Sequence, residues 1–300
     1  MTGLDGTRAA AAVVTLHCSL GSGRQWTKLA GALGGTPFMA PDISGYGVAA
    51  CGRDWPRTLE GEIARLEPWL AKARGPIHLV GHSYGGAIVF RLATASHYAH
   101  RIRSLTLIEP VLPTLLRDGS ADTRLYDRFA RIAQVVSQDI FDGAVLEAVE
   151  AFTAFWAGSG PREQFSPSGR LRMIEQAGKL PYDFNAALDL DGVAATARAL
   201  RVPTLLVSGG LSPYVTQRIV AKLAAIIDGA EMRHLPAAGH MLPVTHAERV
   251  NPEILRHIWR AEELAKLEFA AGAGPTEAAA AAAQPAGSAR PHLVFRRGFN

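Results

Sequence analysis

The sequence has little cysteine and no pattern of the kind that binds a metal ion or a nucleotide. Among its 300 residues only Cys18 and Cys51 are cysteines, and neither belongs to a C-x-x-C pair or a Cys/His cluster. A disulfide framework and a zinc site are therefore not indicated, and the composition suits a reducing cytoplasm. No G-x-G-x-x-G follows the first predicted strand, and no G-x-x-x-x-G-K-[ST] loop is present. We expect neither a cofactor nor a metal ion.

Long apolar runs and a strong charge imbalance are also lacking. The apolar run at residues 9–16 is too short to span a bilayer, and the residues before it lack the charged-then-apolar layout of a signal peptide. The formal net charge is +4, and the basic residues are scattered with no interleaved aromatic stripe. We therefore expect a cytoplasmic monomer or homodimer that binds a small-molecule substrate and has neither a nucleic acid nor a membrane as a partner.

Apolar residues make up 48% of the chain, enough for one large core. Short apolar runs alternate with stretches whose apolar residues recur at helical spacing, and this alternation predicts an α/β fold with a mostly parallel central sheet and helices on both faces. The predicted strands are residues 11–16, 37–40, 77–80, 104–108, 205–208 and 231–235, and helices are predicted around residues 26–33, 59–70, 87–93, 125–136, 145–156, 168–177, 191–200, 219–226 and 250–259.

No strand pattern occurs from about residue 113 to residue 200, which predicts a helical cap inserted into the core. The core would consist of residues 1–112 and 201–270. Residues 271–300, rich in Ala, Gly and Pro, have no periodic apolar face and predict a disordered tail. Aromatic residues of the cap could close an apolar pocket, although we favour the simpler interpretation that they pack the cap itself; they are Phe129, Phe152, Phe155 and Trp156.

The stretch from Leu79 to Gly86 carries the clearest functional signal. An apolar strand leads into the sequence Gly81-His82-Ser83-Tyr84-Gly85, and a helix-compatible run follows at once. This is the G-x-S-x-G pattern of a nucleophile elbow, in which a sharp turn exposes the serine hydroxyl and a Cβ at either glycine would meet neighbouring backbone. The helix that follows directs its positive end at Ser83 and favours an anion there. We therefore predict that Ser83 is a nucleophile.

Together with the Gly239-His240 loop after the last strand, this elbow resembles the α/β-hydrolase superfamily, and the resemblance spans residues 11 to about 265. The resemblance implies that Ser83 is the nucleophile and His240 the general base. His234 and His246 are alternatives for the base, but only His240 follows a glycine on the expected loop. The resemblance also implies an oxyanion hole formed by the backbone N–H groups of Ser19 and Tyr84.

The acid departs from the usual pattern of the family, because Ser212 occupies the position where many members have Asp. Glu109 ends the strand that follows the elbow helix, and a carboxylate there shares one sheet edge with Ser83, so we predict Glu109 as the acid. The alternative is that Glu109 forms a salt bridge with Arg101 or Arg103. Asp42 precedes the elbow and is explained more simply as a turn residue.

This resemblance implies a serine hydrolase that cleaves a small, fairly apolar ester, thioester or lactone through an acyl-enzyme. Two alternatives remain open: a carbon–carbon bond hydrolase with the same triad, and a ligand-binding homologue without catalysis, which the Ser212 departure makes worth testing. A dehalogenase is disfavoured because its chemistry needs a carboxylate nucleophile where this sequence has Ser83.

Overall fold

The computed structural model describes residues 9–50, 52, 54–117, 120–160 and 166–272. The chain divides into two compact units, residues 1–261 and 262–300. The first unit holds the whole sheet and every candidate site residue, and the second contains the last turns of α11. The predicted disordered tail lies outside the described residues from residue 273 onward; residues 271 and 272 end α11.

The centre of the first unit is a sheet of six strands in the order β2-β1-β3-β4-β5-β6, and all neighbouring pairs are parallel. The strands are β1 (Ala12–Leu16), β2 (Phe38–Met39), β3 (Ile77–His82), β4 (Ile102–Ile108), β5 (Thr204–Gly209) and β6 (Glu231–Leu235). Each predicted strand is found, and its ends lie within about two residues of the predicted ones. The predicted fold class is confirmed.

The helices are α1 (Thr27–Ala32), α2 (Leu59–Leu70), α3 (Tyr84–Ala95), α4 (Ser120–Phe141), α5 (Val145–Ala157), α6 (Pro167–Gln176), α7 (Leu180–Leu188), α8 (Val193–Ala199), α9 (Tyr214–Ile226), α10 (Leu242–Thr245) and α11 (Ala247–Gly272). The sequence pattern does not predict α7 or α10. Each begins with a proline in its first turn, and α10 has only four residues, too few for apolar periodicity to stand out.

Alternate residues of the central strands face two separate apolar cores. Val14 and Leu79 point to the face covered by α2, α3 and α9. Their neighbours Val13 and Val80 point to the opposite face, where α1 and the first turns of α11 cover them. Because successive strand residues point to opposite faces, a strand buried on both sides must be apolar throughout. This requirement explains the uninterrupted apolar runs.

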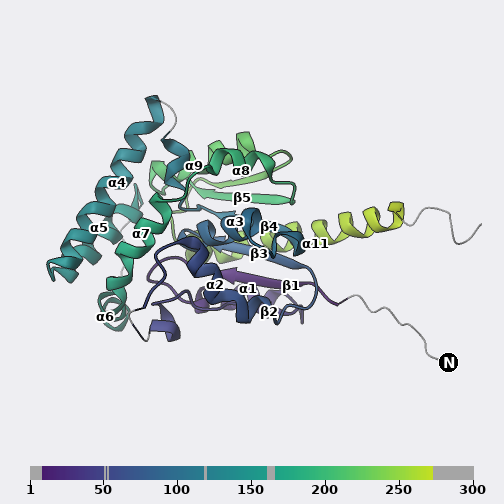
Figure 1. Ribbon diagram of the computed structural model, residues 1–300, viewed down its shortest axis with the longest axis horizontal. Coiled ribbons are helices and arrows are strands. Elements are labelled where there is room, and N and C mark those ends of the chain that lie inside the picture. Colours follow the sequence, from purple (N-terminus) through teal and green to yellow (C-terminus); the bar gives the residue numbers. More distant parts are fainter. Residues whose placement is uncertain (1–8, 51, 53, 118–119, 161–165, 273–300) are drawn as a thin grey trace, which may run out of the picture. The chain divides into compact units, whose positions relative to one another are not determined.

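Between β4 and β5 the described residues form helices and loops but no strand, and Figure 1 shows α4, α5, α6 and α7 gathered together at the left. An ion-pair cluster connects this helical segment to α9. The carboxylate of Asp122, on α4, accepts hydrogen bonds from Arg218 at 2.7 and 3.0 Å and from Lys222 at 3.0 Å. These contacts lower the pKa of Asp122 to about 2, chiefly through the hydrogen bonds from Arg218 and Lys222.

A buried histidine in β3 makes the stability of the fold depend on pH. Burial lowers the pKa of His78 to about 4, with a smaller contribution from the nearby positive charge of Arg103. Between about pH 4 and 6.5 the unfolded chain then binds more protons than the folded one. The contribution of His78 to the free energy of unfolding is therefore complete above pH 6.5 and is lost as the pH falls to 4. The loss amounts to about 3 kcal/mol at the acid limit.

We expect His78→Asn, which keeps a polar atom near the Ser104 hydroxyl that lies 2.8 Å from Nδ1, to reduce this acid sensitivity. Urea unfolding at pH 7.5 and pH 4.5 measures it: the free energy of unfolding should fall less between these pH values in the variant than in the wild type. An equal fall in both proteins would contradict the role of His78. The comparison is made within each protein because His17 and His82, which remain, respond to pH in the same direction.

Candidate active site

Ser83 lies at the turn between β3 and α3 in a backbone conformation that serine rarely adopts. Its φ is 57° and its ψ is −120°. A side chain in such a region costs about 1–3 kcal/mol, and proteins retain this strain mainly at functional turns. The hydroxyl does not cap α3, and the turn presents it at the carboxyl end of β3. This is the geometry of a nucleophile elbow.

The two glycines of the elbow are required by close packing. A Cβ at Gly81 would lie 2.3 Å from a methyl group of Val89 and 2.5 Å from the carbonyl oxygen of Gly85. A Cβ at Gly85 would lie 2.4 Å from the carbonyl oxygen of His17, in the loop after β1. All three distances are far below normal contact. The clash with neighbouring backbone that the motif implies is therefore present at both positions.

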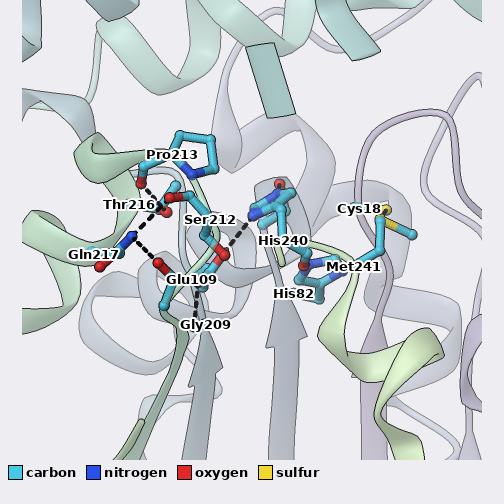
Figure 2. A network of polar contacts seen from close by, with 12 residues as sticks. Cys18, His82, Glu109, Gly209, Ser212, Pro213, Thr216, Gln217, His240 and Met241 are labelled. Atoms are coloured by element: carbon cyan, nitrogen blue, oxygen red, sulfur yellow. Dashed lines mark hydrogen bonds and ion pairs between the residues drawn. The ribbon is translucent and has the colours of Figure 1, made fainter. Parts of the chain in front are cut away.

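Ser83, His240 and Glu109 form one hydrogen-bonded chain. Nε2 of His240 lies 3.0 Å from the hydroxyl oxygen of Ser83, and Nδ1 lies 2.6 Å from Oε2 of Glu109. The second carboxylate oxygen of Glu109 accepts the backbone N–H of Gly209 at 2.7 Å. Figure 2 shows the carboxylate between Gly209 and His240. Because an ionised carboxylate only accepts, Nδ1 carries the proton that it shares with Glu109, and Nε2 is left to accept from Ser83.

Glu109 reaches His240 because the strand pairing continues past the formal ends of the strands. The backbone N–H of Ser83 bonds the carbonyl of Ile108, and that of Glu109 bonds the carbonyl of Val207. Glu109 itself has a positive φ of 44° and is fully buried. The alternative partner Arg101 donates instead to backbone carbonyls near the end of α2, one of them at 2.8 Å.

The other candidate side chains do not join this hydrogen-bonded chain. Nδ1 of His234 lies 2.9 Å from the hydroxyl of Ser208, and Nδ1 of His246 lies 2.9 Å from the hydroxyl of the preceding threonine. Asp42 accepts backbone N–H groups at 2.6 and 2.7 Å, as a turn residue does. The hydroxyl of Ser212 is buried and has no hydrogen-bond partner among the described residues. The structure therefore brings Glu109, and not an acid at position 212, to His240.

Two further histidines, His17 and His82, are buried beside the site, and the sequence interpretation does not include them. Burial lowers the pKa of both, so both are neutral. Nε2 of His17 accepts the N–H of Ile43 at 2.9 Å, and Nδ1 therefore donates to the carbonyl of Cys18 at 2.7 Å. Nε2 of His82 donates to the carbonyl of His240 at 2.8 Å. These hydrogen bonds hold the loops after β1 and β6 in place. The one sequence feature that could have indicated a role for His82 is its position inside the elbow motif, next to Ser83.

Ser19 and Tyr84, the residues implied for the oxyanion hole, both line a small cavity next to Ser83. Tyr84 is the first residue of α3, so its N–H has no acceptor within the helix. The side chain of Ser19 donates its hydroxyl to Asp183 at 2.5 Å. Both residues therefore lie beside Ser83 at this small cavity, with Tyr84 at the positive end of α3.

A cavity of about 1130 Å³ opens at Ser83 and His240. Its wall comes from the loops after β1, β5 and β6 and from helices α5 and α6; apolar residues in it include Leu20, Phe152, Trp156, Met173, Leu211 and Met241. The polar groups that line it include the hydroxyls of Ser19 and Ser83 and the guanidinium groups of Arg24, Arg170 and Arg172. A largely apolar concave site with a few polar groups is typical of small-molecule binding.

The aromatic residues of the helical segment fall into two groups. Phe152 and Trp156 line the cavity, whereas Phe129 and Phe155 do not line it and pack against Trp156, with ring centroids 6.4 and 5.1 Å from that of the tryptophan. Trp156 stacks on His240 with ring centroids 4.3 Å apart and an angle of 19° between the planes. The expectation that all four only pack the cap is therefore too simple, since this tryptophan contacts the histidine directly.

Within the described ranges, no group of three or more His, Cys, Asp and Glu side chains is arranged to hold a metal ion. The same part of the chain contains no helix long and apolar enough to cross a membrane.

Comparisons with known proteins agree with this architecture. Lipase LipV of Mycobacterium tuberculosis is 32% identical over 157 residues, which cover 52% of this chain and 55% of LipV, so the chain spans about half the length of this relative. The structure is similar to MenH from S. aureus, with a TM-score of 0.66, 17% identity and coverage of 84% of this chain and 94% of that one. It is also similar to a bromoperoxidase from Bacillus anthracis, with a TM-score of 0.64, 20% identity and coverage of 84% and 92%. At these identities the structural likeness concerns the fold alone.

A family model described as the alpha/beta hydrolase family matches residues 13–253. The matched range begins in β1, includes the elbow and the loop with His240, and ends in the first turns of α11. Because this match covers most of the chain, the protein belongs to the alpha/beta hydrolase family.

Proposed function

We propose that this protein is a serine hydrolase that cleaves a small, fairly apolar ester, thioester or lactone through an acyl-enzyme. The observation that carries the proposal is the hydrogen-bonded chain from Glu109 through His240 to Ser83, which ends at the wall of a cavity of about 1130 Å³. The similarity to a lipase, an ester hydrolase by name, supports the same reaction class.

In the proposed acylation step, Ser83 attacks the substrate carbonyl while Nε2 of His240 takes the hydroxyl proton. Glu109, bonded to Nδ1, keeps the imidazole in the required tautomer and stabilises the imidazolium that forms. His240 then passes the proton to the leaving alcohol or thiol. In the second half-reaction His240 activates water, which releases the acid and restores Ser83.

The negative charge that develops on the substrate oxygen would be stabilised by the backbone N–H groups of Ser19 and Tyr84. Each such donor contributes about 3 kcal/mol to the transition state. The N-terminus of α3 adds a favourable field at the same place. A non-catalytic binding protein has no need of the strained φ of Ser83, which is the feature that favours catalysis over simple binding.

We further propose that residues 113–200 form the cap of this enzyme, with residues 1–112 and 201–270 as its core. Phe152 and Trp156 of α5 and Met173 of α6 line the cavity together with Ser83. A cap that supplies apolar wall to the site would select the substrate by shape, whereas the core supplies the reacting groups.

The proposal is tested with p-nitrophenyl esters of two to twelve acyl carbons and with a fluorophosphonate probe, using the full chain. We expect ester hydrolysis with a preference for one range of chain length, and a mass increase of one phosphonyl group on the peptide that contains Ser83. The His240→Ala variant, confirmed to be folded, should lose both hydrolysis and rapid labelling because Ser83 then lacks its base.

Wild-type protein that is labelled at Ser83 but inert to all esters would retain the serine-hydrolase assignment and change the substrate class. Protein that is neither labelled nor active would contradict the proposal and favour a ligand-binding member of the family.

A further inference from the structure

A charged cluster is buried behind the loop that carries Ser19, and the reaction proposed above makes no use of it. The side chain of Lys179, just before α7, is fully buried and donates to Oε1 of Glu62 at 2.7 Å and to Oδ1 of Asp183. The other oxygen of Asp183, Oδ2, accepts the hydroxyl of Ser19 at 2.5 Å and that of Tyr46 at 2.6 Å. One carboxylate therefore ties together the loop after β1, the loop after β2 and the helical segment.

Burying this cluster is costly, since replacing a buried ion pair with apolar residues is often neutral or stabilising. Stability alone is therefore a weak reason to retain Lys179 and Asp183. Burial disfavours the ammonium form of Lys179, but the carboxylates of Asp183 and Glu62 outweigh it and raise the pKa of Lys179. A permanent positive charge thus lies against Asp183, and it offsets the repulsion between this carboxylate and an oxyanion formed nearby.

Asp183 is also close to the reacting groups. It lines, with Ser19, Ser83 and Tyr84, the small cavity beside the nucleophile, whose volume of about 10 Å³ is that of roughly one water-sized probe. The side chain is 5% exposed. The carboxylate that binds Ser19 therefore shares this small cavity with the nucleophile.

The loop after β1 needs such a restraint. Leu20, next to Ser19, has a φ of 59°, a conformation that costs about 1–2 kcal/mol for a residue with a side chain. On one side the backbone of this loop packs against the start of α3, where even a Cβ at Gly85 would lie 2.4 Å from the carbonyl of His17. On the other side the hydroxyl of Ser19 is bonded to Asp183. The loop is clamped between the elbow and α7.

We propose that Asp183, supported by Lys179 and Tyr46, is a positioning residue that holds Ser19 so that its backbone N–H faces the oxyanion. Because Asp183 lies on α7, the helical segment completes the oxyanion hole as well as the cavity wall. This inference rests on the proposed function for its catalytic consequence, but the restraint on the loop is a property of the protein that is measurable without any substrate.

The first test is Ser19→Ala, which removes the hydroxyl and keeps the backbone N–H. Removing an oxyanion donor outright lowers kcat by about 10²–10³-fold. Releasing the donor from its restraint while keeping the N–H should lower kcat by less, about tenfold to hundredfold. We expect kcat to fall by this factor with KM within about twofold of the wild type, and the inhibition constant of a trifluoromethyl ketone, which mimics the tetrahedral state, to rise by the same factor.

The matched control is Thr114→Val. The hydroxyl of Thr114 also makes a buried hydrogen bond of 2.5 Å within the helical segment, to the carbonyl of Leu190, and Thr114 does not line the cavity. Both variants should lose a similar amount of thermal stability, and only Ser19→Ala should change kcat and inhibitor affinity. Equal kcat and inhibition constants in Ser19→Ala and wild type would overturn the proposal.

Hydrogen exchange of the peptide that covers residues 17–23 gives a readout that does not depend on activity. We expect faster exchange there in both Ser19→Ala and Asp183→Asn than in the wild type, and no change in Thr114→Val. Unchanged exchange in Ser19→Ala, the milder of the two substitutions, would overturn the positioning role even if no ester is hydrolysed. An inactive wild type with a protected loop would instead contradict the proposed function alone.

Discussion

Replacing Ser83 with alanine is expected to lower kcat/KM for the best p-nitrophenyl ester by about 10⁵-fold or more. The nucleophile of a triad acts together with its base, so removing it abolishes the acyl-enzyme route and leaves only the binding and oxyanion contributions. The measurement is the rate of nitrophenolate release, combined with intact-mass analysis after treatment with a fluorophosphonate. The variant should show no phosphonyl adduct.

Ser96→Ala is the matched control, because it makes the same chemical change at the opposite end of α3. There the hydroxyl donates to the carbonyl of Leu92 at 2.7 Å, far along the helix from the cavity. Activity in this variant should equal that of the wild type. Hydrolysis that survives Ser83→Ala at more than about a hundredth of the wild-type rate would show that the nucleophile is not Ser83.

The second large effect is expected for Glu109→Gln, which should lower kcat by about 10⁴-fold while the protein remains folded. The amide group has nearly the same shape as the carboxylate, and it can still accept the N–H of Gly209. Its neutral charge no longer stabilises the imidazolium of His240, and its NH₂ group favours the wrong tautomer. The pH–rate profile of the residual activity measures the loss directly.

Ser212→Asp tests whether a carboxylate in the loop after β5 can replace Glu109, which follows β4, as the partner of His240. Ser212 lies next to the site at the position where the family usually has its acid, and its buried hydroxyl has no partner among the described residues. In the double variant with Glu109→Gln, we expect a carboxylate at position 212 to restore part of the lost rate. Full activity in Glu109→Gln alone would instead show that His240 needs no acid from β4.

The sequence predicted the elbow, the strand segments and the loop with His240, because these features depend on residues that are neighbours along the chain. Glu109 was predicted for a related reason. A residue that directly follows β4 must lie at the same sheet edge as Ser83, which directly follows β3, once the two strands are parallel neighbours. The carboxylate contact with His240 itself, across 131 residues, was a hypothesis until the loop after β6 was placed.

The buried cluster around Lys179 was not predicted. In the sequence, Lys179 and Asp183 form an ordinary i,i+4 pair of opposite charge, which is most often a solvated pair on a helix surface. Its burial depends on Glu62, 117 residues away, and on Ser19, 164 residues from Asp183. The sequence likewise did not distinguish Trp156 from the other aromatic residues of the helical segment, and its stacking on His240 is seen only in the structure.

The sequence by itself therefore determined the fold class and the turn at Ser83, since the apolar runs and the G-x-S-x-G pattern that indicate them each lie within a few neighbouring residues. Only the tertiary structure decided which carboxylate meets His240, which aromatic residue covers it, and which buried acid holds Ser19. Each of these depends on the distance between side chains from different strands and helices, and that distance is set by how the whole chain packs.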